Sequence, residues 1–451
     1  MARAERVRWT IAATLAGLGL LASEPGLAAQ SGAAARQSSL PVVRATSKVA
    51  DVRDGDVLQR GYWSILPEVR PDVYVVRQVG RGKRVAFYTD ADSISFDVTR
   101  GSTHDFVIVL ANGDSAFTRV TTVDPNRLNY TRPGGSPREA DTIPFTLGRG
   151  NKIFVRGSVN GSDSLDLMFD TGANVVVLSK SGLRKGAKLS FTGTQENTAF
   201  GGSHTVRQSS GNTLDVGGLR WRGVPIVAID NADGDGIIGY NVFEDKVVEI
   251  DYDRRIIVVR GSLPTLGAGM APLTMRLEGG LMFVEAELVN EAGAHRGWFG
   301  LDTGASWGLY VGDAFAAATR LRGTMEPLGE RSSGGLGANR VRTELVRLPR
   351  LRIGGHELRG VPIDLEVPSG ERPRGDGILG MDVLRRFNTV LDLREYQITF
   401  KPNGLVGEAY NESTRPNPAV VAAVALALAG LAAAGFLGMR RRRARRRAAS
   451  A

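Results

Sequence analysis

Residues 168–179 read MFDTGANVVVLS, and residues 300–311 read GLDTGASWGLYV. Each stretch places Asp-Thr-Gly-Ala between apolar runs of the kind that form buried strands. A carboxylate without a partner is costly to bury in such surroundings. The repetition therefore indicates that Asp170 and Asp302 serve one shared purpose.

The two stretches belong to a longer internal repeat that orders the second half of the chain. Segments of the first copy recur in the same order in the second, and the matching pairs are 153–173 with 282–305, 214–230 with 351–367, and 234–259 with 375–400. The period is far longer than the roughly 20–50 residues of solenoid repeats. The repeat predicts two homologous, strand-rich lobes at 141–262 and 268–403. Within them only 240–245 and 381–387 have the pattern of short helical turns.

Each Asp-Thr-Gly-Ala loop is followed by a downstream apolar-apolar-Gly motif, Ile237-Ile238-Gly239 in the first copy and Ile378-Leu379-Gly380 in the second. This combination resembles the aspartic proteases. The Asp-Thr-Gly-Ala form is most similar to the retropepsin-like branch, whereas the fused two-lobe layout is similar to pepsin. The resemblance covers a little over half of the chain and implies an all-β fold of two barrel-like lobes with one Asp in each.

In this family two carboxylates meet across a pseudo-twofold axis and share a proton, because like charges so close cannot both ionise. The resemblance makes Asp170 and Asp302 the catalytic pair, in which one carboxylate draws a proton from a bound water while the other donates to the substrate carbonyl. The pair titrates as a unit, so neither residue is assigned as the acid or the base. The residues that would support the two loops, by hydrogen bonding across the axis or by close packing, are Thr171, Gly172, Gly239, Thr303, Gly304 and Gly380.

Aspartic proteases also close a β-hairpin flap over the substrate, and each lobe has a glycine-rich segment between its Asp and its downstream glycine motif. The segments are TAFGGSHTV (198–206) and SSGGLGANRV (332–341), and their central glycines are Gly201, Gly202, Gly334 and Gly335. Two flaps fit retropepsin-like symmetry, whereas pepsin uses one. Neither segment contains Tyr, so pepsin's flap tyrosine has no counterpart here.

Both ends of the chain have the features of export and membrane anchoring. Residues 1–29 combine arginines, an apolar stretch and small residues, as in a secretory signal peptide. Residues 419–439 carry no charge and match the roughly 20 residues that cross a bilayer, and the arginine-rich tail 440–451 should stay cytoplasmic. We therefore expect a single-pass protein of the cell membrane whose folded part is extracytoplasmic, with a linker at 30–40 and a stalk at 404–418. Alternatively, the C-terminal segment is a sorting tail that is removed after export.

Residues 41–140 are predicted to form a small β domain. Short runs rich in β-forming residues alternate there with turn signals, among them Asn112-Gly113, which predicts a tight hairpin. No catalytic constellation stands out in this domain. Its sequence leaves open a regulatory unit, a substrate-docking unit and a pro-segment.

The formal net charge of +10 comes mainly from the ends of the chain. The tail arginines and a small excess in the signal region account for most of it, so the exported body is nearly neutral and nucleic acid is not an expected partner. The sequence has no Cys, which excludes disulfides and thiol catalysis. The four His are scattered without metal-ligand spacing, so we expect neither a metal nor a cofactor.

Two other functions compete with proteolysis by the Asp pair. GASWG (304–308) fits the Gly-x-Ser-x-Gly pattern of serine hydrolases, with Ser306 as nucleophile, but that motif needs a following helix and a strand-like run follows here. The other is a catalytically silent module that binds peptides on the same fold. Because both Asp loops are intact, the sequence favours an aspartic endopeptidase that hydrolyses peptide bonds. Two fused copies favour a monomer with intramolecular lobe pairing, because linkage raises the effective concentration of each lobe for the other.

Overall fold

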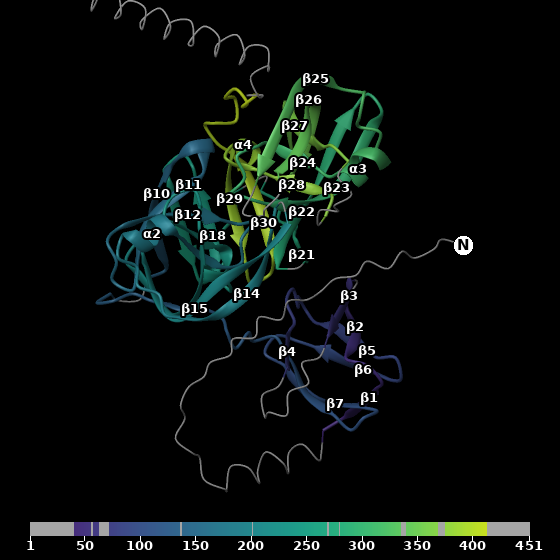
Figure 1. The fold of residues 1–451 in the computed structure, drawn as a ribbon. Helices are drawn as coiled ribbons and strands as arrows, with labels where there is room; N and C mark the ends of the chain where they lie inside the picture. The colour runs from purple at the N-terminus through teal and green to yellow at the C-terminus, as the bar shows by residue number, and fades with distance from the viewer. Residues whose placement is uncertain are drawn as a thin grey trace, which may run out of the picture.

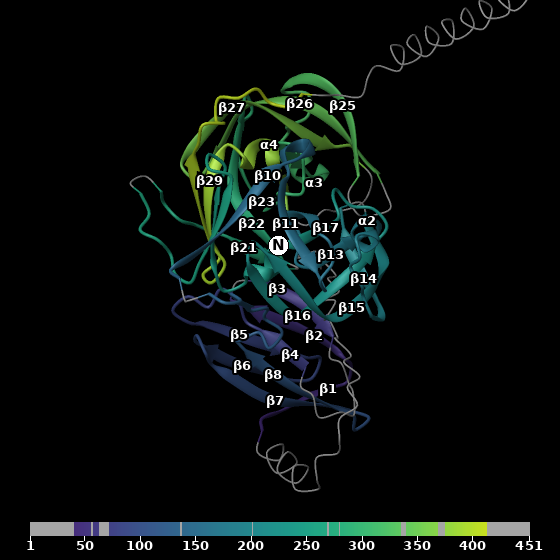
Figure 2. The same ribbon diagram turned by 90° about the vertical axis from the view of Figure 1, so that its left-hand side faces the viewer.

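The computed structural model describes residues 40–412, except 56, 63–71, 136–137, 201, 268–269, 279, 335–339 and 369–374. A small N-terminal domain lies below two larger lobes that stand next to each other (Figure 1). Strands dominate these residues, and the helices between them are short. The view turned by 90° shows the same division, with the purple and dark blue strands of the N-terminal domain under the lobes (Figure 2).

The N-terminal domain consists of two sheets with strand orders β1-β7-β8-β4 and β3-β2-β5-β6. Their buried faces share one apolar core that includes Val52, Phe87 and Phe106. The predicted hairpin at Asn112-Gly113 is confirmed, because it connects two antiparallel strands and Gly113 has the left-handed φ of +88°. The strands are β1 (Val42–Ala45), β2 (Val49–Asp54), β3 (Val57–Tyr62), β4 (Asp72–Val75), β5 (Lys83–Tyr88), β6 (Ser93–Val98), β7 (Thr103–Leu110) and β8 (Ser115–Thr121).

The first lobe follows through the short strand β9 (Tyr130–Thr131), which pairs with the lobe's own strand β16. The strands of this lobe are β10 (Ala140–Leu147), β11 (Ile153–Val159), β12 (Leu165–Asp170), β13 (Val176–Ser179), β14 (Phe191–Ala199), β15 (Gly202–Val216), β16 (Leu219–Ile229), β17 (Gly236–Gly239), β18 (Val247–Asp251) and β19 (Ile256–Arg260). Its helical segments are η1 (Arg149–Asn151), α2 (Lys180–Arg184) and η2 (Tyr240–Phe243).

The second lobe repeats this order of elements from β12 onward, as the sequence repeat predicts. Its strands are β20 (Leu273–Thr274), β21 (Arg276–Glu278), β22 (Leu281–Asn290), β23 (Gly293–Leu301), β24 (Leu309–Val311), β25 (Glu326–Gly334), β26 (Arg340–Ile353), β27 (His356–Glu366), β28 (Gly377–Leu379), β29 (Phe387–Asp392) and β30 (Gln397–Pro402), and its helices are α3 (Asp313–Ala318) and α4 (Met381–Leu384). In both lobes the strand before the Asp lies parallel to the glycine-motif strand, as β12 does to β17 and β23 to β28. The structure is thus mostly β with barrel-like lobes.

A run of strands from both copies joins the lobes. The order β10-β19-β18-β29-β30-β20 crosses from the first lobe to the second at β18 and β29, which pair antiparallel with Val248 opposite Leu391. Figure 1 shows the yellow strands β29 and β30 of the second copy between the blue and green lobes. This shared sheet fixes the two lobes relative to each other.

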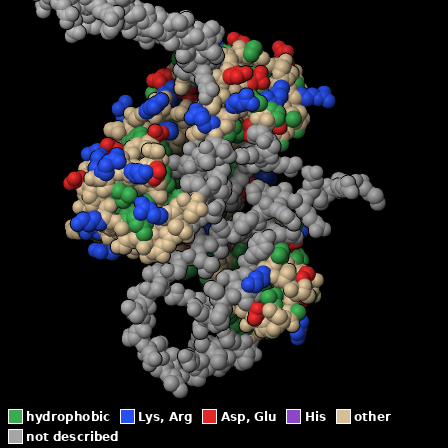
Figure 3. Space-filling view, in the orientation of Figure 1, with side chains coloured by type: hydrophobic (Ala, Val, Ile, Leu, Met, Phe, Trp, Pro, Cys, Tyr) green, Lys and Arg blue, Asp and Glu red, His purple; other side chains and the backbone are tan. Residues whose placement is uncertain are grey.

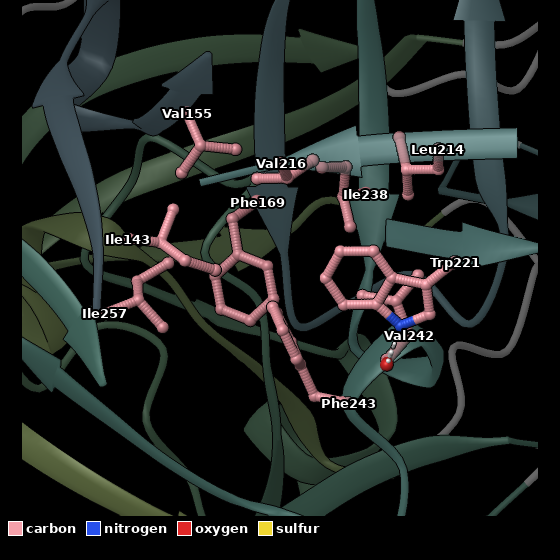
Figure 4. A pocket seen from close by; sticks show the side chains of 10 residues that line it. All are labelled: Ile143, Val155, Phe169, Leu214, Val216, Trp221, Ile238, Val242, Phe243 and Ile257. Carbon is pink, nitrogen blue, oxygen red and sulfur yellow. Dashed lines mark hydrogen bonds between the residues drawn. The ribbon is translucent and has the colours of Figure 1, made fainter. Parts of the chain in front are cut away.

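The core of the first lobe lies directly under the strand that ends in Asp170. Figure 4 shows the Phe169 ring pointing into it, among apolar side chains that include Ile143 and Phe243. The indole N–H of fully buried Trp221 donates to the Val242 carbonyl at 2.9 Å, drawn as a dashed line. Because successive strand residues face opposite ways, burying Phe169 turns Asp170 away from this core.

On the face of the molecule shown in Figure 3, Lys and Arg side chains are interspersed with Asp and Glu side chains over both lobes. Many of the charged side chains of the described residues are paired, as in the 2.8 Å contact between Arg352 Nη1 and Glu287 Oε2. The visible face therefore carries charges of both signs, with no large field of one sign on the described residues.

The structure adds short helices that the sequence pattern did not indicate. The helical turns at 240–245 and 381–387 are present as η2 and α4, but α2 and α3, which follow β13 and β24, were not expected. The predicted signal peptide, at 1–29, and the predicted membrane span, at 419–439, lie outside the described residues. Among the residues that are described, no helix is both long and apolar enough to cross a membrane.

Candidate active site

The two aspartates occupy matching places at the ends of buried strands. Asp170 is the last residue of β12, and its parallel partner on β17 is Gly239. Asp302 directly follows β23, and its backbone N–H donates to the Leu379 carbonyl of β28 at 3.0 Å. The strand pairs thus deliver both carboxylates to the junction of the lobes.

The two threonines hold the loops together by a reciprocal set of hydrogen bonds. The Thr171 hydroxyl donates to the Leu301 carbonyl at 2.9 Å and accepts from the Thr303 N–H at 3.1 Å. The Thr303 hydroxyl donates to the Phe169 carbonyl at 2.8 Å and accepts from the Thr171 N–H at 3.0 Å. Both threonines are 2% exposed, so every bond lies away from water. Four buried bonds therefore fix one Asp loop against the other.

The glycines after the threonines bring each carboxylate close to the opposite loop. A Cβ added to Gly172 would lie 2.7 Å from Asp302 Cγ, and one added to Gly304 would lie 2.5 Å from Asp170 Oδ2. Each glycine N–H also donates at 2.8 Å to the Oδ1 atom of the Asp in its own loop. Any side chain at either position would occupy the space of the opposite carboxylate.

The downstream glycines let a supporting strand pass close behind each loop. A Cβ on Gly239 would lie 2.5 Å from the Ala173 carbonyl oxygen, and one on Gly380 would lie 2.3 Å from the Trp307 carbonyl oxygen. The first residue of each following helix donates its N–H to the loop, from Met381 to the Ala305 carbonyl at 2.8 Å in the second lobe. Strand and helix together hold the loop from behind.

Electrostatics favour one shared proton on the pair. Loss of contact with water raises the pKa of both carboxyls, and for Asp302 this loss, together with the charge of Asp170, raises the pKa well above its usual value. The glycine N–H groups act in the opposite direction because they stabilise the ionised forms. A pair in which one carboxyl stays protonated while the other ionises can serve as acid and base together.

One cation acts on the Asp pair, although no feature of the sequence pointed to it. The charge of Lys152 lowers the pKa of both Asp170 and Asp302. Lys152 lies between η1 and β11. Its side chain is 14% exposed and forms an ion pair with Asp233 at 2.5 Å. Its proximity arises from the fold, because a lone Lys before a strand looks like a surface residue in the sequence. Among the described residues, no group of three or more His, Asp or Glu side chains could hold a metal ion.

The proposed flap segments lie at the tips of two long hairpins. Gly202 begins β15 and Gly334 ends β25, whereas Gly201 and Gly335 lie outside the described residues. The first hairpin joins β14 to β15 with Ala199 opposite Gly202, so Phe200 lies at its tip. The sequence pointed to the glycines of this segment but not to Phe200.

Ser306 lies in the loop between β23 and β24, and a strand follows it. A serine-hydrolase elbow requires a helix at that place. The serine alternative therefore lacks its structural context, and Asp170 and Asp302 remain the pair that the fold brings together.

Comparison with protein-family models agrees with this geometry. A family model described as aspartyl protease matches the chain twice, over residues 155–242 and 284–383, one match in each lobe. The crystal structure of an aspartic proteinase from Irpex lacteus matches with 16% sequence identity and a TM-score of 0.44, and covers 60% of this chain and 100% of that chain. No curated protein matches. Each of the two lobes of this chain thus matches the aspartyl protease family model.

Proposed function

We propose that this protein is an aspartic endopeptidase that hydrolyses peptide bonds with a water molecule activated between Asp170 and Asp302. The observation that carries the proposal is the reciprocal bonding of Thr171 and Thr303, which fixes the two carboxylates in one place. A silent binding module would not need this arrangement of the aspartates. Pre-organised acid and base groups at one point are what hydrolysis of an amide requires.

In the proposed reaction the ionised carboxylate accepts a proton from water as the oxygen attacks the scissile carbonyl carbon. The protonated carboxyl donates its proton to the carbonyl oxygen, and a tetrahedral diol forms without a covalent bond to the enzyme. Transfer of a proton to the amide nitrogen then allows the C–N bond to break. The raised pKa of the coupled pair keeps one proton available for this cycle.

The first experiment replaces each aspartate separately with Asn in the full-length protein. Both Asp170→Asn and Asp302→Asn should reduce cleavage of a peptide library by at least about 10³-fold, because the pair loses its acid–base function. Ser306→Ala serves as the control and should keep full activity. Retained turnover in either Asn variant would refute a shared pair, and wild-type protein that binds peptides without cutting them would favour the silent module.

We further propose that the catalytic part is extracytoplasmic and tethered to the cell membrane as a monomer. This proposal rests on the sequence of 1–29, which has the build of a signal peptide, and of 419–451, an uncharged stretch followed by arginines. Membrane fractionation of protein tagged at both ends tests it. A stable soluble product without the C-terminal tag would show that the tail is removed instead.

A further inference from the structure

The tip of the first-lobe hairpin reaches across to the second lobe. Phe200 follows β14 directly, and its ring lies 5.1 Å from the Trp307 ring and 5.1 Å from the Tyr310 ring, measured between centroids. The Tyr310 contact is edge-to-face at 89°, and the Trp307 contact is tilted at 52°. Both are geometries that aromatic rings favour. The hairpin tip is thus held by a three-ring cluster.

The aromatic pair is built into the support of the Asp302 loop. Trp307 lies five residues after Asp302, and its carbonyl accepts the Asp382 N–H at 3.1 Å. Tyr310 lies on β24 opposite Ile378 of β28. The next residue of β28 is Leu379, whose carbonyl accepts the Asp302 N–H. The rings of Trp307 and Tyr310 are themselves 6.0 Å apart. Phe200 therefore rests next to the catalytic loop of the second lobe.

The corresponding positions of the first lobe carry no aromatic residues. Val177 pairs with Ile237 as Tyr310 pairs with Ile378, and Val175 packs on Gly239 as Trp307 packs on Gly380. The repeat has thus diverged at the two positions that hold Phe200. Structural support of the loop alone does not explain aromatic rings in one lobe and valines in the other.

Trp307 also has an unused hydrogen-bond donor. Its indole nitrogen is buried and has no partner among the described residues. Leaving a buried N–H unpaired is unfavourable, and a bound peptide carries carbonyl oxygens that could accept from it. The indole is therefore better satisfied with a ligand beside it than with Phe200 alone.

We propose that Trp307 and Tyr310 form a subsite for a large apolar substrate side chain, and that Phe200 fills this subsite in the free protein and is displaced when substrate binds. This proposal rests on the proposed function, since it names a competitor within the chain for the substrate site beside Asp302. Displacement lowers the apparent affinity for substrate, because only the fraction of molecules with Phe200 withdrawn can bind. Removing the ring should therefore strengthen binding.

Binding is best measured without turnover, in Asp302→Asn protein of full length. The probe is a hexapeptide with a hydroxyethylene group in place of the central amide and Phe on both sides of it. Adding Phe200→Ala should lower Kd on the order of tenfold, whereas Phe200→Tyr, which keeps the ring, should leave Kd near the parent value. Phe191→Ala is the matched control, because Phe191 lies on the same hairpin and is 38% exposed. A weaker or unchanged Kd for Phe200→Ala overturns the proposal.

A second readout needs neither ligand nor activity. Phe200→Ala should shift tryptophan emission to longer wavelength, because the Trp307 ring loses a neighbour and gains water. The same substitution in a Trp307→Phe background should leave the emission unchanged. Unaltered emission in the first protein would show that Phe200 does not rest on Trp307. If the peptide assays detect no cleavage but these two readouts agree, the endopeptidase proposal fails while the intramolecular contact stands.

Discussion

At the scale of single residues, Thr171 and Thr303 explain why the two Asp loops act as one unit. Each hydroxyl uses its hydrogen as a donor and its oxygen as an acceptor, and all four partners lie in the opposite lobe. The carbonyls of Phe169 and Leu301 and both threonine N–H groups are thereby satisfied in a buried place. The hydroxyls, more than the threonine methyl groups, are therefore what the site needs.

Replacing Thr171 with Val should destabilise the fold and reduce activity together. Valine keeps the shape but leaves the Leu301 carbonyl and the Thr303 N–H without partners, at a cost of about 2–4 kcal/mol for two buried groups. Chemical denaturation and kcat/KM on a cleaved peptide would measure both effects. Thr171→Ser should recover most of the loss, and Thr146→Val, at an exposed position of β10, should change little. Equal stability of the Thr171→Val and Thr146→Val proteins would contradict this role of the hydroxyl.

Lys152 should shift the pH range in which the pair works. Its positive charge stabilises the ionised carboxylates and so lowers the pKa of both, against the larger effect of lost solvation. In Lys152→Met this stabilisation is lost, both pKa values rise, and each carboxyl ionises at higher pH. The acid and basic limbs of the profile of kcat/KM against pH should therefore both move to higher pH. Lys180→Met is the control, because Lys180 is 60% exposed and pairs with a surface Asp. If the pH profiles of Lys152→Met and Lys180→Met coincide, Lys152 does not influence the pKa values of the pair.

At the scale of elements, the parts that could be predicted from the sequence are those that occur in both copies of the repeat. The Asp loops, the glycine-motif strands β17 and β28, and the helical turns behind them all follow from matched motifs. Helices α2 and α3 were missed because they are only 5 and 6 residues long, too short for a periodic pattern. Phe200 was missed for another reason, since its partners Trp307 and Tyr310 come from the other lobe and no local pattern links them.

The glycine-motif strands make a prediction of their own. Gly380→Ala should push the Asp302 loop out of place, because the new methyl group would meet the Trp307 carbonyl oxygen at 2.3 Å. Backbone cannot yield as a flexible side chain does, so we expect a loss of about 1–3 kcal/mol in stability and a larger proportional loss in kcat/KM. Thermal unfolding and peptide cleavage measure the two. Gly261→Ala is the matched control, because a Cβ at Gly261 would meet nothing within 4 Å. Full activity of Gly380→Ala would show that the site does not need the close approach of Gly380 to the Trp307 carbonyl.

At the scale of the whole molecule, the repeat implied two lobes but not how they are joined. The pairing of β18 with β29 links residues far apart in sequence, and many apolar strands would have been equally suitable partners. The place of the N-terminal domain was not predictable either, because it depends on polar contacts between surfaces. Arg77 of that domain bonds Glu244 of the first lobe at 2.8 Å, and Tyr396 of the second lobe lies 3.4 Å from the same carboxylate. Three parts of the molecule thus meet at Glu244.

This junction suggests that the N-terminal domain braces both lobes. Further contacts support it, since Arg127 pairs with Asp245 at 2.8 Å, Gln78 donates to the Met275 carbonyl, and Arg100 pairs with Glu395. These partners lie on both lobes, so a domain that holds them also fixes the angle between the lobes. We therefore expect any effect of this domain on the Asp pair to act through the arrangement of the lobes.

A double-mutant cycle tests the brace. Arg77→Ala and Glu244→Gln, singly and together, should give a coupling energy of about 1–2 kcal/mol in thermal unfolding, because the bond is charge-assisted and both side chains are largely shielded from water, at 32% and 16% exposure. The control cycle uses Arg84 and Asp97, which lie 3.7 Å apart within the domain and are 67% and 83% exposed. Such an exposed pair should couple by well under about 1 kcal/mol. Equal coupling in the two cycles would mean that the junction at Glu244 is an ordinary surface contact, and that the lobes hold their angle without the domain.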